Sequence, residues 1–92
     1  MNINITARNI KISENLSEII HIRLAKLLKY DKYISDIKVI LLKENRAEKI
    51  ELIVRSHKHS YITKAFSSKF EKTLARAIEN ILIQIRKNRK KR

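Results

Sequence analysis

The 92-residue sequence predicts an α+β domain with the element order β-α-β-β-β-α, a four-stranded mixed sheet with two helices packed on one face. Apolar residues alternate with polar ones over four short segments, which is typical of half-buried strands. Over two longer segments they recur every three or four residues, which is typical of amphipathic helices. Stacking both helices on the sheet buries all of these apolar surfaces together.

The N-terminal part predicts a parallel β-α-β unit. Alternation over residues 2–7 indicates the first strand, and Ser13 is a favourable N-cap for a helix that continues to about Tyr30. Alternation resumes over residues 34–43, which indicates the second strand. Two strands that flank a helix are expected to pair in parallel through a right-handed crossover.

Two further strands complete the predicted sheet. Residues 50–55 and 61–66 alternate again, and the polar segments 43–49 and 56–60 that precede them indicate turns. Because these connections are short, we expect both strands to form antiparallel hairpins.

The last helix, over residues 69–92, is the most informative segment. Ser68 and Glu71 have the spacing of a capping box that opens it. One face is apolar, and the opposite side carries Lys69, Lys72, Arg76, Lys87 and Lys90. Six of the seven residues in the basic tail 86–92 are Lys or Arg.

The charge of the whole chain points to a polyanionic partner. Lys and Arg total 22 against 9 Asp and Glu, which gives a formal net charge of +13 and a pI of about 10.4. AT-rich coding explains an excess of Lys, Asn and Ile, but not the segregation of charge by helix face. The first helix adds Lys26, Lys29 and the bordering Arg23, with Ile22 exposed between them. We therefore expect both helices to present cations to phosphates.

Several classes of protein are excluded or disfavoured by composition. The chain has no Cys, Gly or Pro, which removes disulfides, thiolate metal sites and Gly-rich phosphate loops. No apolar run approaches the roughly 20 residues that span a bilayer, and the N-terminus does not resemble a signal peptide. We expect a cytoplasmic protein with no membrane partner, metal, cofactor or small-molecule substrate.

A catalytic site receives little support. Arg55, His57, His59 and Tyr61 would lie along one face of a hairpin, a set that general acid–base cleavage of RNA could use. No carboxylate accompanies them to orient the imidazoles, and zinc needs three or four ligands. We expect a protein that is not an enzyme, with a nuclease that cleaves RNA as the weaker alternative.

The aromatic residues indicate how RNA would be recognised. We expect Tyr61 and Phe70 in the core, and Tyr30 and Tyr33 packed between the first helix and the sheet rather than stacked on bases. Without paired aromatics on strands, shape and phosphate recognition of folded RNA is favoured over reading of base sequence.

Three segments, 1–9, 12–16 and 26–30, resemble the ribosome hibernation-promoting factors, also called ribosome-associated inhibitors or sigma-factor modulation proteins. The resemblance continues through the three-strand meander to the basic final helix. It implies one ribosome-binding domain over residues 1–92 that lies on ribosomal RNA of the small ribosomal subunit. There it would block the mRNA and tRNA sites and silence translation in stress or stationary phase.

The resemblance also implies which basic residues contact RNA. The family's basic positions match Arg23 and Lys26 on the first helix, which Lys29 extends. On the last helix they match Arg86, Lys87, Arg89 and Lys90. Together with the helix-face argument, the predicted RNA-binding set is Arg23, Lys26, Lys29, Lys69, Lys72, Arg76, Arg86, Lys87, Arg89 and Lys90.

The chain departs from the family pattern at three positions, and other functions stay open. Ala7 and Ser67 stand where the family often has Gly, and Lys69 stands near an expected acid. A generic RNA-binding, ribosome-assembly or constitutive ribosomal protein is the main alternative. A ribosome-dependent mRNA nuclease that uses Arg55, His57, His59 and Tyr61 is less favoured, and a peripheral protein of anionic membranes is weaker still.

Overall fold

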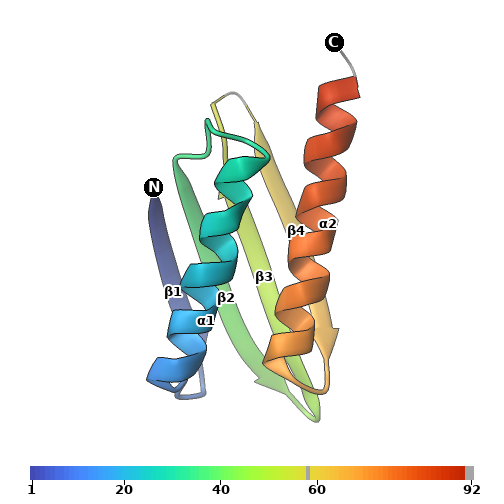
Figure 1. Cartoon of the computed structure of the whole chain (residues 1–92). Helices are drawn as coiled ribbons and strands as arrows, with labels where there is room; N and C mark the ends of the chain where they lie inside the picture. The colour runs from blue at the N-terminus through green and yellow to red at the C-terminus, as the bar shows by residue number, and fades with distance from the viewer. Residues whose placement is uncertain (58, 91–92) are drawn as a thin grey trace.

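The computed structural model describes residues 1–57 and 59–90, without the side chain of Lys90. The element order confirms the predicted α+β fold, with a short 3₁₀ helix, η1, added after the first helix (Figure 1). The elements are β1 (Asn2–Arg8), α1 (Glu14–Ala25), η1 (Lys26–Lys29), β2 (Asp36–Glu44), β3 (Ala47–Arg55), β4 (Ser60–Ser67) and α2 (Phe70–Lys90).

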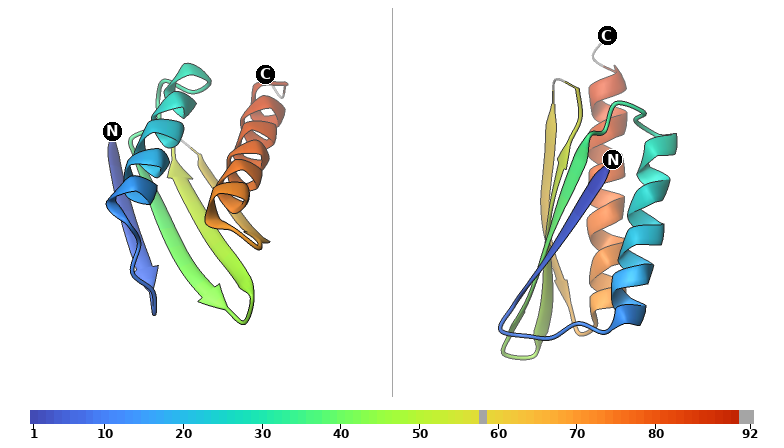
Figure 2. Two further views of the ribbon diagram at one scale, coloured as in Figure 1. Left: turned by 60° about the horizontal axis from the view of Figure 1, so that its bottom comes forward. Right: turned by 90° about the vertical axis from the view of Figure 1, so that its left-hand side faces the viewer.

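The four strands form one mixed sheet in the order β1-β2-β3-β4. β1 pairs in parallel with β2, and the β2–β3 and β3–β4 pairs are antiparallel, as predicted. Both helices lie on the same face of this sheet, and the second view in Figure 2 shows the two layers from the side. Alternate residues of each strand face the helices and form the core, for example Val39, Leu52 and Leu41.

The end of the first helix differs from the prediction of one continuous helix. Ser13 caps α1, since its Oγ accepts a hydrogen bond of 3.1 Å from the Leu16 amide. The α-helical pattern stops at Ala25 and continues as η1. There the amides of Tyr30 and Asp31 both donate to the Leu27 carbonyl. Such tightening is common in the last turn of a helix, where carbonyls lack α-helical partners.

The β2–β3 connection is shorter than the polar segment 43–49 suggested. β2 continues to Glu44 and β3 begins at Ala47, so only two residues form the turn. Asn45 has a φ of 57°, a left-handed conformation that asparagine tolerates better than most residues. The polar side chains predicted to form a loop instead extend the hairpin ladder.

The start of α2 also differs from the prediction. The helix begins at Phe70, one residue later than a Ser68–Glu71 capping box requires. The Phe70 amide donates a hydrogen bond of 2.6 Å to Glu48 Oε1 on β3. A carboxylate 22 residues away along the chain therefore caps this helix.

Side chains at every fourth position of α2 fasten it to the edge strand β4. Arg76 and Gln84 donate to backbone carbonyls of β4 that point away from β3, whereas Asn80 and Asn88 donate to side-chain oxygens. The pairs are Arg76 Nη1 to Phe66 O, Asn80 Nδ2 to Thr63 Oγ1, Gln84 Nε2 to Ile62 O and Asn88 Nδ2 to Tyr61 Oη, at 2.9, 3.0, 2.9 and 3.1 Å. This ladder fixes the orientation of the basic helix on the sheet.

Candidate nucleic-acid interface

Most of the predicted RNA-binding side chains are accessible. Arg23 is half-buried at the border of the apolar stripe, as expected. Lys90 belongs to α2, but its side chain lies outside the described residues. The exposed members are Lys26, Lys29, Lys69, Lys72, Arg76, Arg86, Lys87 and Arg89.

These cations are spread along the length of the molecule. The Cα trace measures 42 × 21 × 16 Å, and α2 extends over roughly 30 Å of the long dimension. Lys69 and Lys72 lie at the start of α2, whereas Arg86 and Arg89 lie near its other end. The predicted basic tail is helical as far as Lys90, and residues 91 and 92 lie outside the described part.

The cations on α2 also point in different directions. Arg76 lies on the flank beside β4, where one of its nitrogens is held by the Phe66 carbonyl. Lys87, eleven residues or about three turns later, falls on the same flank. Arg89 lies on the other flank, since it shares a cavity with residues of η1. Arg76 and Lys87 thus share one flank, as the helical repeat predicts, whereas Arg89, which the family resemblance added, lies on another.

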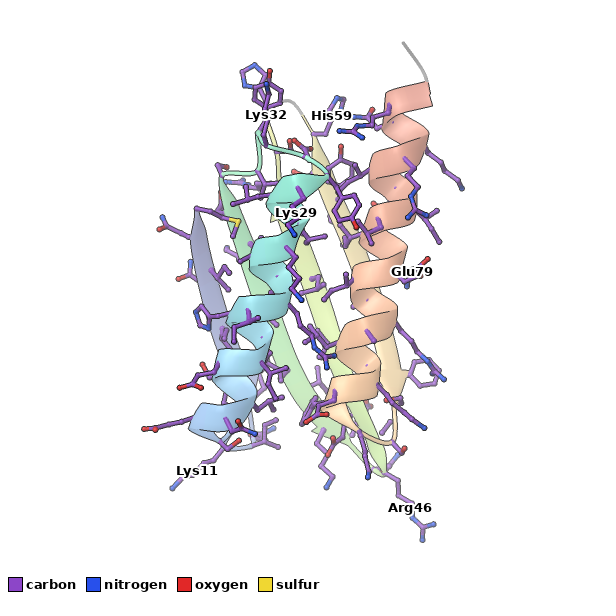
Figure 3. All side chains as sticks on the ribbon, viewed as in Figure 1. Lys11, Lys29, Lys32, Arg46, His59 and Glu79 are labelled. Atoms are coloured by element: carbon purple, nitrogen blue, oxygen red, sulfur yellow. The ribbon has the colours of Figure 1, made fainter. Side chains whose placement is uncertain are left out.

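That cavity brings together two distant parts of the predicted set. It has a volume of about 570 Å³ and lies where the end of η1, the β3–β4 turn and the last turns of α2 meet. Lys29 and Arg89 both line it. Figure 3 shows Lys29, Lys32 and His59 at this end of the molecule. We name it the tyrosine–histidine pocket, after its lining residues Tyr30, Tyr33, His57, His59 and Tyr61.

Aromatic rings are paired within this pocket. The ring centroids of Tyr33 and His57 are 5.6 Å apart, and those of His59 and Tyr61 are 6.4 Å apart. The Lys32 ammonium lies 5.3 Å from the centre of the Tyr33 ring, a cation–π arrangement. The pocket therefore combines π surfaces with positive charge.

Hydrogen bonds connect the segments that form the walls. The Asp31 carboxylate accepts from the Tyr33 amide at 2.9 Å and from Ser56 Oγ at 2.6 Å, which joins the loop after η1 to the β3–β4 turn. Asn88 donates to the buried Tyr61 hydroxyl and joins α2 to β4. The pocket is thus built by contacts between distant segments.

The prediction for Tyr30 and Tyr33 was wrong. Their side chains are 41% and 56% exposed instead of being packed against the sheet. Tyr61 is buried as expected, and Phe70 is partly buried against the core. In the segment from Lys29 to Tyr33 each tyrosine directly follows a lysine, and this was the sequence signal for the pocket. Lys32 is the cation that the prediction omitted.

The structure does not assemble the alternative catalytic set. β3 directs Arg55 to the open face of the sheet, because Val54 and Leu52 face the helices. Tyr61 faces the helices, and Arg55 is not among the residues of the pocket. The expectation that these side chains share one hairpin face was therefore wrong.

The described part of the chain holds neither a cluster of metal ligands nor a membrane-spanning helix. Within residues 1–57 and 59–90, no three His, Asp or Glu side chains gather closely enough to hold a metal ion. In the same part of the chain, no helix is sufficiently long and apolar to cross a bilayer.

The fold and this site define a class, a small basic α+β domain with two helices on one face of a mixed sheet and a cation-rimmed aromatic pocket. The chain belongs to the Sigma 54 modulation protein / S30EA ribosomal protein family, whose sequence profile matches residues 3–92. This confirms the family resemblance seen in the sequence.

Two solved structures share the fold at low sequence identity. A ribosomal subunit interface protein from Coxiella burnetii is 21% identical, with a TM-score of 0.91 over 97% of this chain and 98% of that one. The N-terminal domain of Thermus thermophilus Protein Y is 20% identical, with a TM-score of 0.85 over 95% and 98%. No curated protein matches the sequence.

Proposed function

We propose that this protein is a ribosome hibernation factor. It binds the small ribosomal subunit, contacts ribosomal RNA and sterically blocks the mRNA and tRNA sites, which inhibits translation in the cytoplasm during stress or stationary phase. The observation that carries the proposal is the family match over residues 3–92, which covers the strands and helices of the fold except Asn2, the first residue of β1. One of the similar structures is itself named a ribosomal subunit interface protein.

The distribution of charge supports binding to a folded RNA. A net charge of +13 on a domain of this size favours association with phosphates. Exposed cations at both ends of α2 can reach phosphates that are far apart along a strand but close in a folded RNA. The proposed contacts are the ten predicted cations, with Lys29 and Arg89 at the pocket and Lys69 and Lys72 at the opposite end.

The proposed mechanism is occupation of a site, without a chemical step. The core and the α2–β4 ladder hold the domain as a compact wedge. Specificity then comes from the shape of the RNA, and affinity comes from Arg and Lys contacts to phosphate. A nuclease is not favoured, because Arg55 lies on the sheet face opposite to Tyr61.

Co-sedimentation tests this function. The purified protein is centrifuged with ribosomes and with separated subunits at low and high salt, with and without mRNA and initiator tRNA. Binding to the small subunit is expected to disappear when mRNA and tRNA are present. If six to ten phosphates are neutralised, affinity falls by roughly 10³–10⁵ between 50 and 200 mM salt. Absence of binding to either subunit would overturn the proposal.

A second measurement separates hibernation from a constitutive ribosomal role. The protein is quantified on ribosomes from growing cells and from starved cells. A hibernation factor is expected mainly on ribosomes from starved cells. Equal, stoichiometric amounts in both samples would favour a ribosomal or assembly protein instead.

A further inference from the structure

The tyrosine–histidine pocket has features that phosphate binding alone does not explain. Surface Lys and Arg are sufficient to hold an RNA backbone. Here Tyr30 and Tyr33 are left 41% and 56% exposed at the pocket, although other large side chains at this end, such as Leu27 and Ile85, are buried. Their rings are therefore available to a ligand with a π surface.

The cations around the pocket define the other part of such a ligand. Lys29, Lys32 and Arg89 line it, and Asp31 is the one carboxylate among its described lining residues. Both oxygens of Asp31 already accept hydrogen bonds from Tyr33 and Ser56. The site therefore favours a group that is aromatic and also carries negative charge.

The size and construction of the pocket fit one such group. Its volume of about 570 Å³ lies within the range of about 300–1,000 Å³ that is typical of small-ligand sites. The Asp31–Ser56 and Asn88–Tyr61 hydrogen bonds hold its walls in place. A simple anion would leave the rings unused, and an apolar ligand would leave the cations unused.

We propose that the pocket holds a single unstacked nucleotide of an RNA strand. The base stacks on Tyr30 or Tyr33, and the adjoining phosphate is bound by Lys29 and Arg89. Aromatic side chains bind unpaired bases in this way irrespective of sequence, since every base has a π face. The ribosomal source of the RNA rests on the proposed function, whereas the chemistry of the pocket does not.

The test compares single-stranded and paired RNA with the full-length protein. Fluorescence anisotropy measures binding of a labelled single-stranded hexanucleotide and of a fully paired hairpin with the same number of phosphates. The Tyr30→Ala/Tyr33→Ala variant is expected to bind the single strand about ten-fold or more weakly. Its binding to the hairpin should stay within two-fold of the wild type. Tyr30→Phe/Tyr33→Phe keeps the rings and should bind both RNAs like the wild type.

Two controls make the outcome specific. Both tyrosines are exposed, so circular dichroism should show the same fold in every variant. Lys72→Gln removes a cation from the opposite end of α2 and should weaken the binding of both RNAs equally. The proposal is overturned if the alanine variant loses affinity for both RNAs alike, or for neither.

A further arm distinguishes RNA from free nucleotides. Nucleoside 5′-monophosphates and the hexanucleotide are titrated separately while the ring resonances of Tyr30, Tyr33 and His59 are followed by NMR. Shifts with the hexanucleotide support the proposal, whereas shifts with mononucleotides alone overturn the assignment to RNA. If the alanine variant still co-sediments like wild type and neither titration shifts these resonances, the pocket proposal fails and the hibernation function stands.

Discussion

Asn88 Nδ2 on α2 donates a hydrogen bond of 3.1 Å to the phenolic oxygen of Tyr61 on β4. Tyr61 is otherwise buried in the core, so this contact gives its hydroxyl a partner and holds the last turns of α2 against the sheet. The basic end of the helix and one wall of the tyrosine–histidine pocket both depend on this position.

A double-mutant cycle measures that contact. Tyr61→Phe keeps the ring and removes the hydroxyl, and Asn88→Ala removes the donor. We expect a coupling of about 0.5–1.5 kcal/mol in the free energy of unfolding, measured by urea denaturation. A coupling near zero would show that the two groups act independently.

The carboxylate that caps α2 should contribute to stability. Glu48→Ala removes the acceptor of the Phe70 amide and is expected to cost about 1 kcal/mol in unfolding free energy. Glu48→Gln keeps an acceptor oxygen and should lose less. Glu79→Ala, at an exposed position on the same helix, serves as the control and should change stability by less than about 0.5 kcal/mol. Equal effects of Glu48→Ala and the control would contradict the cap.

The ladder along β4 should protect the edge of the sheet. Arg76 and Gln84 occupy the outward carbonyls of Phe66 and Ile62, whose side chains are 63% and 53% exposed on the open sheet face. Unpaired edges of this kind promote self-association. Arg76→Ala/Gln84→Ala should therefore increase light scattering on mild heating. Arg86→Ala removes the same charge elsewhere on α2, and scattering from it should match the wild type.

The Glu44–Lys49 ion pair predicts a titration that can be measured directly. A hydrogen bond from the Lys49 ammonium, aided by its charge, lowers the pKa of Glu44 below its ordinary value of 4.5. The pair therefore stabilises the fold above that value, and the contribution is lost as pH falls through the lowered pKa. Lys49→Ala should return the pKa of Glu44 to its ordinary value of about 4.5, which a titration of the Glu44 carboxyl resonance by NMR measures. An unchanged titration would show that the pair does not persist in solution.

Charge reversal at the pocket tests its place in ribosome binding. Lys29→Glu/Arg89→Glu should weaken co-sedimentation with the small subunit and reduce the salt slope by about one for each phosphate that the variant no longer binds. Lys11→Glu/Arg46→Glu makes the same charge change at the opposite end of the molecule (Figure 3). If both variants lose affinity equally, net charge alone determines binding. Melting temperatures should stay close to wild type for both, because all four side chains are exposed.

The local pattern of apolar and polar residues was sufficient to predict the strands and helices and the way in which the strands pair. Alternation identified the four strands and helical spacing identified both helices, because each element has one clearly apolar face. Short connections then required antiparallel hairpins, and the helical crossover required a parallel pair. The errors in the fold were confined to ends and turns, such as the start of α2, where Glu48 replaces the local cap.

The sequence by itself determined the fold class and the excess of positive charge, since these follow from composition and from the order of apolar faces. The family was indicated separately, by the resemblance of three segments to its members. Only the tertiary structure decided which charges act together. It placed Arg55 away from Tyr61 and gathered Lys29, Tyr33, His59 and Arg89 around one pocket. Periodicity places a side chain on its own element, whereas a site between elements depends on how three distant segments pack.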